Sequence, residues 1–178
     1  MEAPLGGVNR RLRAPRDMLP LGRMSKSLKR VRAALEAAGL DIIIIETTEL
    51  TRTAAQAAAE AGCHVDQIAK SIIFRGETSG EAVLFLTAGG NQVDASKASA
   101  LAGEPLGKAD AALIRAQTGF AIGGVSPVGH LSPIRAFIDP RLTEFGVIWA
   151  AAGTPRHIFA LAPDDLIALT GGAIAEFT

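Results

Sequence analysis

The sequence has a single cysteine, Cys63, and no hydrophobic run long enough to cross a membrane. One cysteine excludes an internal disulfide bond and fits a reducing compartment. The apolar run at residues 42–45, like the others in the sequence, falls far short of the roughly eighteen residues that a membrane span needs. The Arg-rich N-terminus also lacks the apolar core of a secretory signal. We therefore expect a soluble, cytoplasmic protein with no membrane partner.

Aromatic residues are also scarce, at 4% of the chain, and the formal net charge is zero. Few aromatic side chains leave little surface for stacking on bases. The charge is uneven, because residues 33–178 carry nine basic and sixteen acidic side chains, a net charge of −7. Neither the glycine spacing of a dinucleotide-binding motif nor a P-loop is present. We expect neither a specific DNA partner nor a nucleotide cofactor.

Residues 1–23 differ in composition from the rest of the chain. They show no apolar periodicity and combine five arginines with three prolines and three glycines. We predict a flexible basic N-terminal extension here and a single domain over residues 24–178, with Met24 as a plausible alternative start. The extension could serve as an arm for RNA phosphates, but a solvated leader without function is the favoured interpretation.

Apolar periodicity and capping residues predict helices, and β-branched runs bounded by polar turns predict strands. Helices are expected at residues 27–38, 51–62, 95–102, 109–118 and 163–172, and strands at 41–46, 70–76, 82–90, 134–139, 147–153 and 157–162. The strands 70–76 and 82–90 flank a short polar segment and are expected to form an antiparallel hairpin. Because the strands are grouped between early and late helices, we predict an α/β fold of the α+β type, with a mixed, largely antiparallel, twisted sheet flanked by helices.

The stretch GFAIGGVSPVGH, residues 119–130 and here called the glycine loop, holds four glycines and one proline among aliphatic side chains. An exposed connection usually recruits Asn, Asp and Ser, whereas this one recruits Ile122, Val125 and Val128. Its glycines permit a positive φ or the close approach of another molecule, and its proline fixes one φ angle. Two interpretations stay open: a buried tight turn between strands, or a loop that presents peptide N–H groups to a ligand.

Lys70 stands before an apolar run and shares its strand face with Ile72 and Phe74. Burying an unpaired ammonium group costs several kcal/mol. Such a lysine either reaches water along its own stem or faces an anionic ligand. The glycine loop favours the second interpretation, because a point charge beside open peptide N–H groups is what an oxyanion or a phosphate requires.

The histidines and the cysteine do not form a metal-binding pattern. Cys63 and His64 are adjacent, while His130 and His157 lack ligand-like spacing. Ser126 precedes a proline instead of a helix start, which argues against a nucleophile elbow. A Schiff-base lysine enzyme would need a phosphate cup and an acid for the cofactor ring, which we cannot locate. We therefore expect no metal and no cofactor.

Four motifs follow one another along the chain: IAKSIIF from residue 68, GGNQVDASKASAL from residue 89, the glycine loop, and WAAAGTPRHIFALAPDDL from residue 149. In their order and separations they resemble the YbaK/EbsC family of stand-alone aminoacyl-tRNA deacylases, which are related to the editing insertion domain of bacterial prolyl-tRNA synthetase. The resemblance covers residues 27–177. Each motif is modest alone, and the four together are fairly specific.

The resemblance implies site residues at the matching positions. Lys70 would hold the phosphate or the acyl-ester end of the charged tRNA. The glycine loop would wall the pocket and offer backbone donors to the substrate carbonyl through Gly123, Gly124, Ser126, Pro127 and Gly129. Lys70, Gly124 and Ser126 are the expected catalytic residues, and the others are expected to bind substrate.

Three further positions are expected to bind substrate. Gly153 and His157 match the Gly-x-x-x-His pattern of the synthetase editing domain, although His157 is also placed to begin a strand. Asn91, in a Gly-Gly-Asn turn before a helix, is either a pocket residue or simply a turn former.

The activity that the resemblance implies is trans-editing, the hydrolysis of mischarged aminoacyl-tRNA bound by its 3′ acceptor end. The expected substrate is tRNA-Pro carrying a small wrong amino acid, and prolyl-tRNA synthetase is a further expected partner. Without an evident side-chain base, we expect catalysis by positioning and by stabilised charge on the carbonyl oxygen, without a metal. Either the terminal ribose hydroxyl would orient water, or a substrate thiol would attack its own ester. The alternative function is a non-catalytic nucleic-acid-binding or regulatory module, which would depend on the basic extension.

Overall fold

The computed structural model describes residues 24–178, and the predicted N-terminal extension lies outside them. In chain order the elements are α1 (Lys26–Ala37), β1 (Ile44–Glu46), α2 (Ala54–Ala61), the 3-10 helix η2 (Val65–Gln67), β2 (Ala69–Gly76), β3 (Ala82–Ala88), α3 (Ala95–Ala102), β4 (Leu106–Lys108), α4 (Ala111–Thr118), β5 (Arg135–Ile138), the 3-10 helix η3 (Pro140–Glu144), β6 (Ile148–Ala151), β7 (His157–Leu161), α5 (Pro163–Thr170) and β8 (Ala173–Ile174). In this part of the chain no helix is long and apolar enough to span a membrane.

The helices begin and end where the sequence supplies caps. The side chains of Ser25, Thr53, Asp94 and Asp110 accept backbone N–H groups at the starts of α1 to α4, and one such cap contributes about 1 kcal/mol. Glycines in the left-handed conformation end α2 to α5. The five predicted helices are confirmed to within a few residues.

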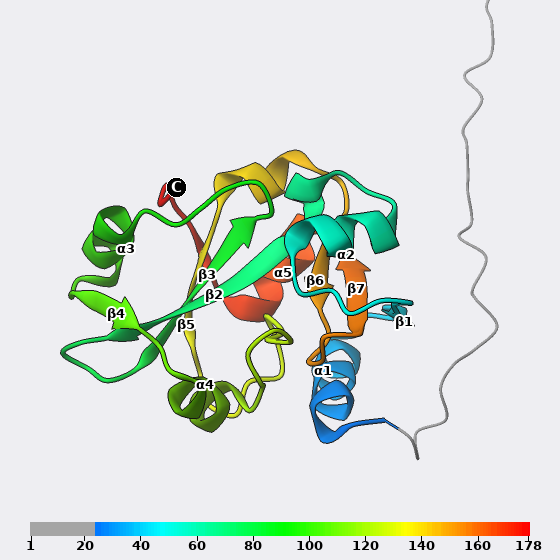
Figure 1. Ribbon diagram of the computed structural model, residues 1–178, viewed down its shortest axis with the longest axis horizontal. Coiled ribbons are helices and arrows are strands. Elements are labelled where there is room, and N and C mark those ends of the chain that lie inside the picture. Colours follow the sequence, from blue (N-terminus) through cyan, green and yellow to red (C-terminus); the bar gives the residue numbers. More distant parts are fainter. Residues whose placement is uncertain (1–23) are drawn as a thin grey trace, which may run out of the picture.

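The strands form two sheets, which Figure 1 shows side by side. The larger sheet has the order β4-β2-β3-β5-β8 and the smaller one the order β1-β7-β6. Pairing is antiparallel, except that β5 runs parallel to β3 and to β8. The predicted hairpin is the β2–β3 pair, and the mixed, largely antiparallel fold is confirmed. The sequence pattern does not predict the division into two sheets or the short strands β4 and β8.

The two sheets meet at a seam made by Gln67 and Ile68 on one side and Val147 and Trp149 on the other. Ile68 forms a parallel bridge with Trp149, and the Gln67 side-chain amide donates to the Val147 carbonyl at 2.9 Å. Helix α2 packs on the seam through Ala57 and Ala58, which cluster with Ile68 and Trp149. The start of β2 thus lies between α2 and β6 (Figure 1).

Candidate functional site

A cleft of about 520 Å³ opens at the seam. Its volume lies within the range of about 300–1,000 Å³ that is typical of small-molecule sites. The first turn of α2, the start of β2, strand β6 and the glycine loop supply its walls, mostly with small or apolar side chains. Among the described residues that line it, Arg52 and Lys70 carry the charged side chains. The cleft is therefore an apolar hollow with positive charge.

Lys70 is half-buried in this cleft and is held at its tip. Its Nζ donates a hydrogen bond to the backbone carbonyl of Asn91 at 2.5 Å. Burial lowers the pKa of Lys70, and the negative charges of Asp139 and Asp66 oppose that effect without cancelling it. The ammonium group is thus tethered within the cleft, next to two carboxylates that favour its charged form.

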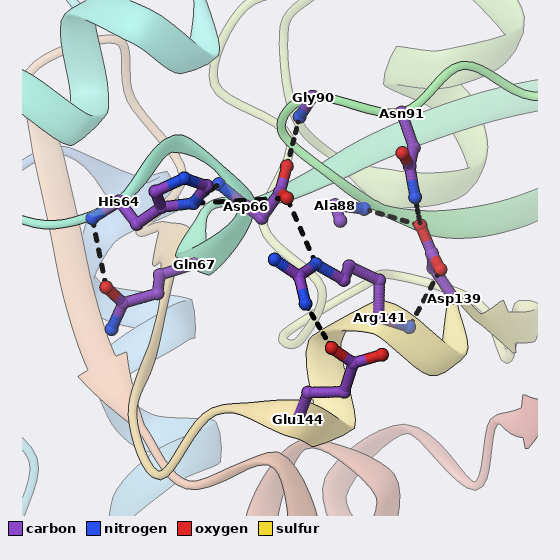
Figure 2. A network of polar contacts seen from close by, with 9 residues as sticks. All are labelled: His64, Asp66, Gln67, Ala88, Gly90, Asn91, Asp139, Arg141 and Glu144. Carbon is purple, nitrogen blue, oxygen red and sulfur yellow. Dashed lines mark hydrogen bonds and ion pairs between the residues drawn. The ribbon is translucent and has the colours of Figure 1, made fainter.

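Asp139 anchors the turn that carries the Asn91 carbonyl, as Figure 2 shows. Asp139 is 2% exposed. It accepts hydrogen bonds from the Asn91 side-chain amide at 2.9 Å, the Ala88 N–H at 3.0 Å and the Arg141 N–H at 2.9 Å. The buried charge is therefore fully hydrogen-bonded, and it fixes residues 88 to 91 against the start of η3.

Asp66 holds the same turn from the opposite side (Figure 2). Its carboxylate accepts the Gly90 N–H at 2.9 Å and the Arg141 Nε–H at 3.0 Å. Arg141 also pairs with Glu144. Partial burial raises the pKa of Asp66, but the hydrogen bonds from Arg141 and Gly90 outweigh burial, so the pKa is lowered. Asp66 is thus held in its charged form at neutral pH.

The glycine loop joins α4 to β5, so its interpretation as a turn between strands is wrong. Gly123 lines the cleft together with Lys70. The N–H of Gly124 donates to the Ala121 carbonyl at 3.2 Å, whereas within residues 24–178 the N–H of Gly123 makes no hydrogen bond. Gly124 packs against the turn after β6, where an added Cβ would lie 2.8 Å from the Thr154 Cα. That contact fixes the position of Gly123 at the cleft.

The remaining predicted residues of the loop lie away from Lys70. Ser126 is completely buried, and its Oγ accepts the Val128 N–H at 3.3 Å. Pro127 and Gly129 line a different hollow, of about 450 Å³, between α1 and α5. The structure therefore groups Gly123 with Lys70 and separates Ser126, Pro127 and Gly129 from it.

Gly153 and His157 also lie outside the cleft. Gly153 is buried with φ near +92°, and a Cβ there would meet Phe120 at 2.9 Å. His157 Nδ1 is 2.6 Å from the Thr154 hydroxyl, and the ring lines a third hollow, of about 330 Å³. Burial lowers the pKa of His157. Gly153 thus maintains the packing of the turn that supports Gly124, and His157 braces the same turn through Thr154.

Asp66, Asp139 and Arg141 are the residues of this region that the motif analysis does not single out. Asp139 ends an apolar strand segment, where a carboxylate needs hydrogen-bond partners if it is buried. That position is the one local signal in the sequence. Asp66 and its partner Gly90 are 24 residues apart along the chain, and Asp139 and its partner Asn91 are 48 residues apart. Only the fold therefore shows these contacts.

Comparison with known proteins gives consistent findings. The family model for the aminoacyl-tRNA editing domain matches residues 48–169. The uncharacterized protein YwhH of Bacillus subtilis is 30% identical over 79% of this chain and 88% of its own length. A protein of Enterococcus faecalis named "Putative Cys-tRNA(Pro)/Cys-tRNA(Cys) deacylase EbsC" is 28% identical over 66% of this chain and 71% of its own length.

A solved structure agrees with this chain in three dimensions. It is a crystal structure of "a putative trans-editing enzyme for prolyl tRNA synthetase", 46% identical, with a TM-score of 0.81 over 87% of this chain and 98% of the other. Sequence family and fold thus agree over most of the described residues, and the chain belongs to the family of aminoacyl-tRNA editing domains.

Proposed function

We propose that this protein is a trans-editing deacylase that binds the 3′ end of mischarged tRNA in the cleft and hydrolyses its aminoacyl ester. The observation that carries the proposal is that Lys70 and Gly123 line one cleft in a member of the editing family, and that the Gly123 N–H makes no hydrogen bond to any residue of the described chain. A cation and a free peptide donor together suit a phosphate or the developing negative charge of an ester carbonyl.

The side chains that line the cleft suit the ester of a small amino acid. Ala57, Ala150 and Ala151 contribute methyl groups, while Trp149 and Ile158 add larger apolar surface. Arg52 at the α2 side adds a second positive charge that suits a backbone phosphate of the acceptor end. In this arrangement the amino acid side chain occupies the apolar part, and the ester lies between Lys70 and Gly123.

The reaction consists of attack by a water oxygen on the ester carbonyl carbon. The bond between that carbon and the ribose oxygen breaks, and the water proton passes to the ribose oxygen, which releases the amino acid and tRNA. Within residues 24–178 no carboxylate, histidine or cysteine lines the cleft. We therefore assign catalysis to positioning, with the terminal ribose hydroxyl orienting the water, and charge stabilisation to Lys70 and the Gly123 N–H. A single such donor contributes roughly 10²–10³-fold in rate.

The substrate that we propose is tRNA-Pro carrying a small non-cognate amino acid. Support comes from the solved relative described as "a putative trans-editing enzyme for prolyl tRNA synthetase" and from the deacylase name of EbsC. A synthetase pocket sized for proline gains only about 1–3 kcal/mol of discrimination per methylene, so a separate hydrolytic check is useful. Prolyl-tRNA synthetase is the corresponding proposed partner.

The test is a panel of tRNA-Pro charged with alanine, cysteine, serine or proline and incubated with the purified full-length protein. We expect ester loss from at least one of the three non-cognate substrates and little from prolyl-tRNA. Lys70→Ala should lower the rate about 100-fold or more. Lys108→Ala, at an exposed lysine of the short strand β4, serves as the matched control and should retain the rate.

Two results would contradict the proposal. One is the absence of ester hydrolysis on the whole panel, which would favour a non-catalytic binding module. The other is a Lys70→Ala protein that folds and hydrolyses the ester as fast as the unmodified protein.

A further inference from the structure

We propose that two carboxylates, Asp139 and Asp66, act as positioning residues that hold the Gly89–Asn91 turn between them and so aim the Asn91 carbonyl at the Lys70 ammonium. The proposal rests on the role of Lys70 proposed above. Neither carboxylate lines the cleft, so both act through the turn and not by contact with substrate.

The contact geometry of Asp139 supports this role. One carboxylate oxygen receives both the Ala88 N–H and the Asn91 side-chain amide, and the other receives the Arg141 N–H. The two donors on the first oxygen flank the turn, one before it and one at its end. Displacement of Asn91 would break the hydrogen bond from its side-chain amide to a buried carboxylate, and such a bond costs more to lose than a bond between neutral groups.

The contact geometry of Asp66 completes the arrangement. It binds the central N–H of the turn, at Gly90, and is itself held by Arg141. A Cβ on Gly90 would lie 2.5 Å from the Asp66 carboxylate, and one on Gly89 would collide with the Val65 carbonyl. The two glycines are therefore required because η2 and its carboxylate approach the turn so closely.

The turn orients Lys70 through one hydrogen bond, which Nζ donates to the Asn91 carbonyl at 2.5 Å. The charged and titratable groups around Lys70 are Asp139 at the β5–η3 junction, Asp66 of η2 with its partners Arg141 and His64, and Arg52 at the α2 side of the cleft. The two carboxylates favour the ammonium form against the effect of burial. Orientation and protonation of Lys70 thus depend on the same two residues.

The experiment measures Lys70 directly by NMR titration of protein labelled with ¹³C at the lysine Cε. The chain has five lysines, and the Lys70→Arg variant identifies the Lys70 signal. Asp139→Asn and Asp66→Asn remove the negative charge while keeping the size of the side chain. Glu144→Gln is the matched control, because Glu144 pairs with the outer side of Arg141 and does not touch the turn. We expect Lys70 to titrate at lower pH in both aspartate variants and at the original pH in the control.

Deacylation over a range of pH gives the second measurement. Its alkaline limit should move to lower pH in Asp139→Asn and Asp66→Asn, whereas a merely structural loss would lower the rate equally at every pH. An unchanged Lys70 titration in a folded aspartate variant would overturn the proposal. Asp66→Asn keeps an oxygen that can accept the Gly90 N–H, so it provides a folded test even if Asp139→Asn does not fold. The titration decides the point even if no ester is hydrolysed, which separates this proposal from the proposed function.

Discussion

Two glycine-rich segments meet the cleft, and they are held in different ways. The Gly89–Asn91 turn is fixed by charged side chains, through Asp66 and Asp139. The glycine loop is fixed by close backbone packing, as at Gly124, and by Arg30. The turn therefore controls the charge in the cleft, through Lys70, while the loop controls its shape.

The comparison teaches that glycine content alone does not identify a ligand-binding loop. In the turn, glycine makes room for a carbonyl and a carboxylate of η2, and in the loop it makes room for the backbone of a neighbouring turn. Of the loop glycines, Gly123 lines the cleft. Substitutions in the turn should consequently lower the activity, whereas substitutions in the loop should lower the stability of the fold.

The largest effect is expected for Gly124→Ala. The new Cβ would lie 2.8 Å from the Thr154 Cα and carbonyl carbon, and backbone atoms cannot move aside cheaply. We expect a loss of about 3 kcal/mol in the free energy of unfolding, measured by urea denaturation. Gly146→Ala is the control, since a Cβ there meets nothing within 4 Å. Equal stability of the two variants would show that the loop is not held by this packing.

The next effect is expected for Arg30→Met, which removes the charged anchor of the loop. Arg30 donates to the Gly119 carbonyl at 2.7 Å and the Gly129 carbonyl at 3.2 Å, and it lies over the Phe120 ring. Loss of these bonds should cost about 2 kcal/mol in unfolding free energy. Arg32→Met is the matched control and should cost under about 0.5 kcal/mol, because Arg32 pairs with an exposed glutamate. A similar loss in both variants would contradict the anchoring role.

For Gly90→Ala in the turn, we expect a smaller loss of stability and, in contrast to the loop variants, a direct loss of activity. The clash there is with the Asp66 carboxylate, which is the end of a side chain that can move. The free energy of unfolding should therefore change by less than about 1 kcal/mol. Deacylation should nevertheless fall roughly fivefold, because the displaced carboxylate loosens the turn that orients Lys70. Normal activity in this variant, measured with the most rapidly hydrolysed mischarged tRNA, would break the proposed contrast between turn and loop.

The smallest expected effect is the pH dependence of stability, which differs between the loop and the turn. Burial lowers the pKa of His130 in the loop, and the hydrogen bond with the Ser126 carbonyl only partly opposes this. The folded state therefore binds fewer protons than the unfolded state, so stability falls as the pH drops below the unfolded histidine value of about 6.5. The lowered pKa of Asp66 makes the turn lose stability only at more acidic pH, below about 3.9. Thermal melts between pH 7.5 and 5 should show a decline that His130→Gln reduces, and an unchanged decline would contradict this assignment.

Much of the fold is predictable from local signals. Capping residues and glycine stops place the five helices, and the polar segment between two apolar runs identifies the β2–β3 hairpin. Strands β4 and β8 are too short to show periodicity, since they span three and two residues. Their existence depends on pairing with neighbouring strands, which is a tertiary effect.

The site is predictable only in part. Lys70 stands out because a cation precedes a buried strand, and Gly123 stands out within an unusually bare loop. Ser126 looks equivalent in the sequence, yet its backbone turns into the core and the side chain is completely buried. The Asp66 and Asp139 contacts join residues that are distant along the chain, and no local pattern encodes such meetings.

The narrow seam between the two sheets has a mechanical consequence. The Ile68–Trp149 bridge and the bond from Gln67 to Val147 join the sheets at the seam, and both sheets share one hydrophobic core. A molecule bound in the cleft would contact β2 and β6 together and so link the two sheets. Occupancy should therefore slow amide hydrogen exchange at Trp149 and raise the melting temperature of both sheets in concert.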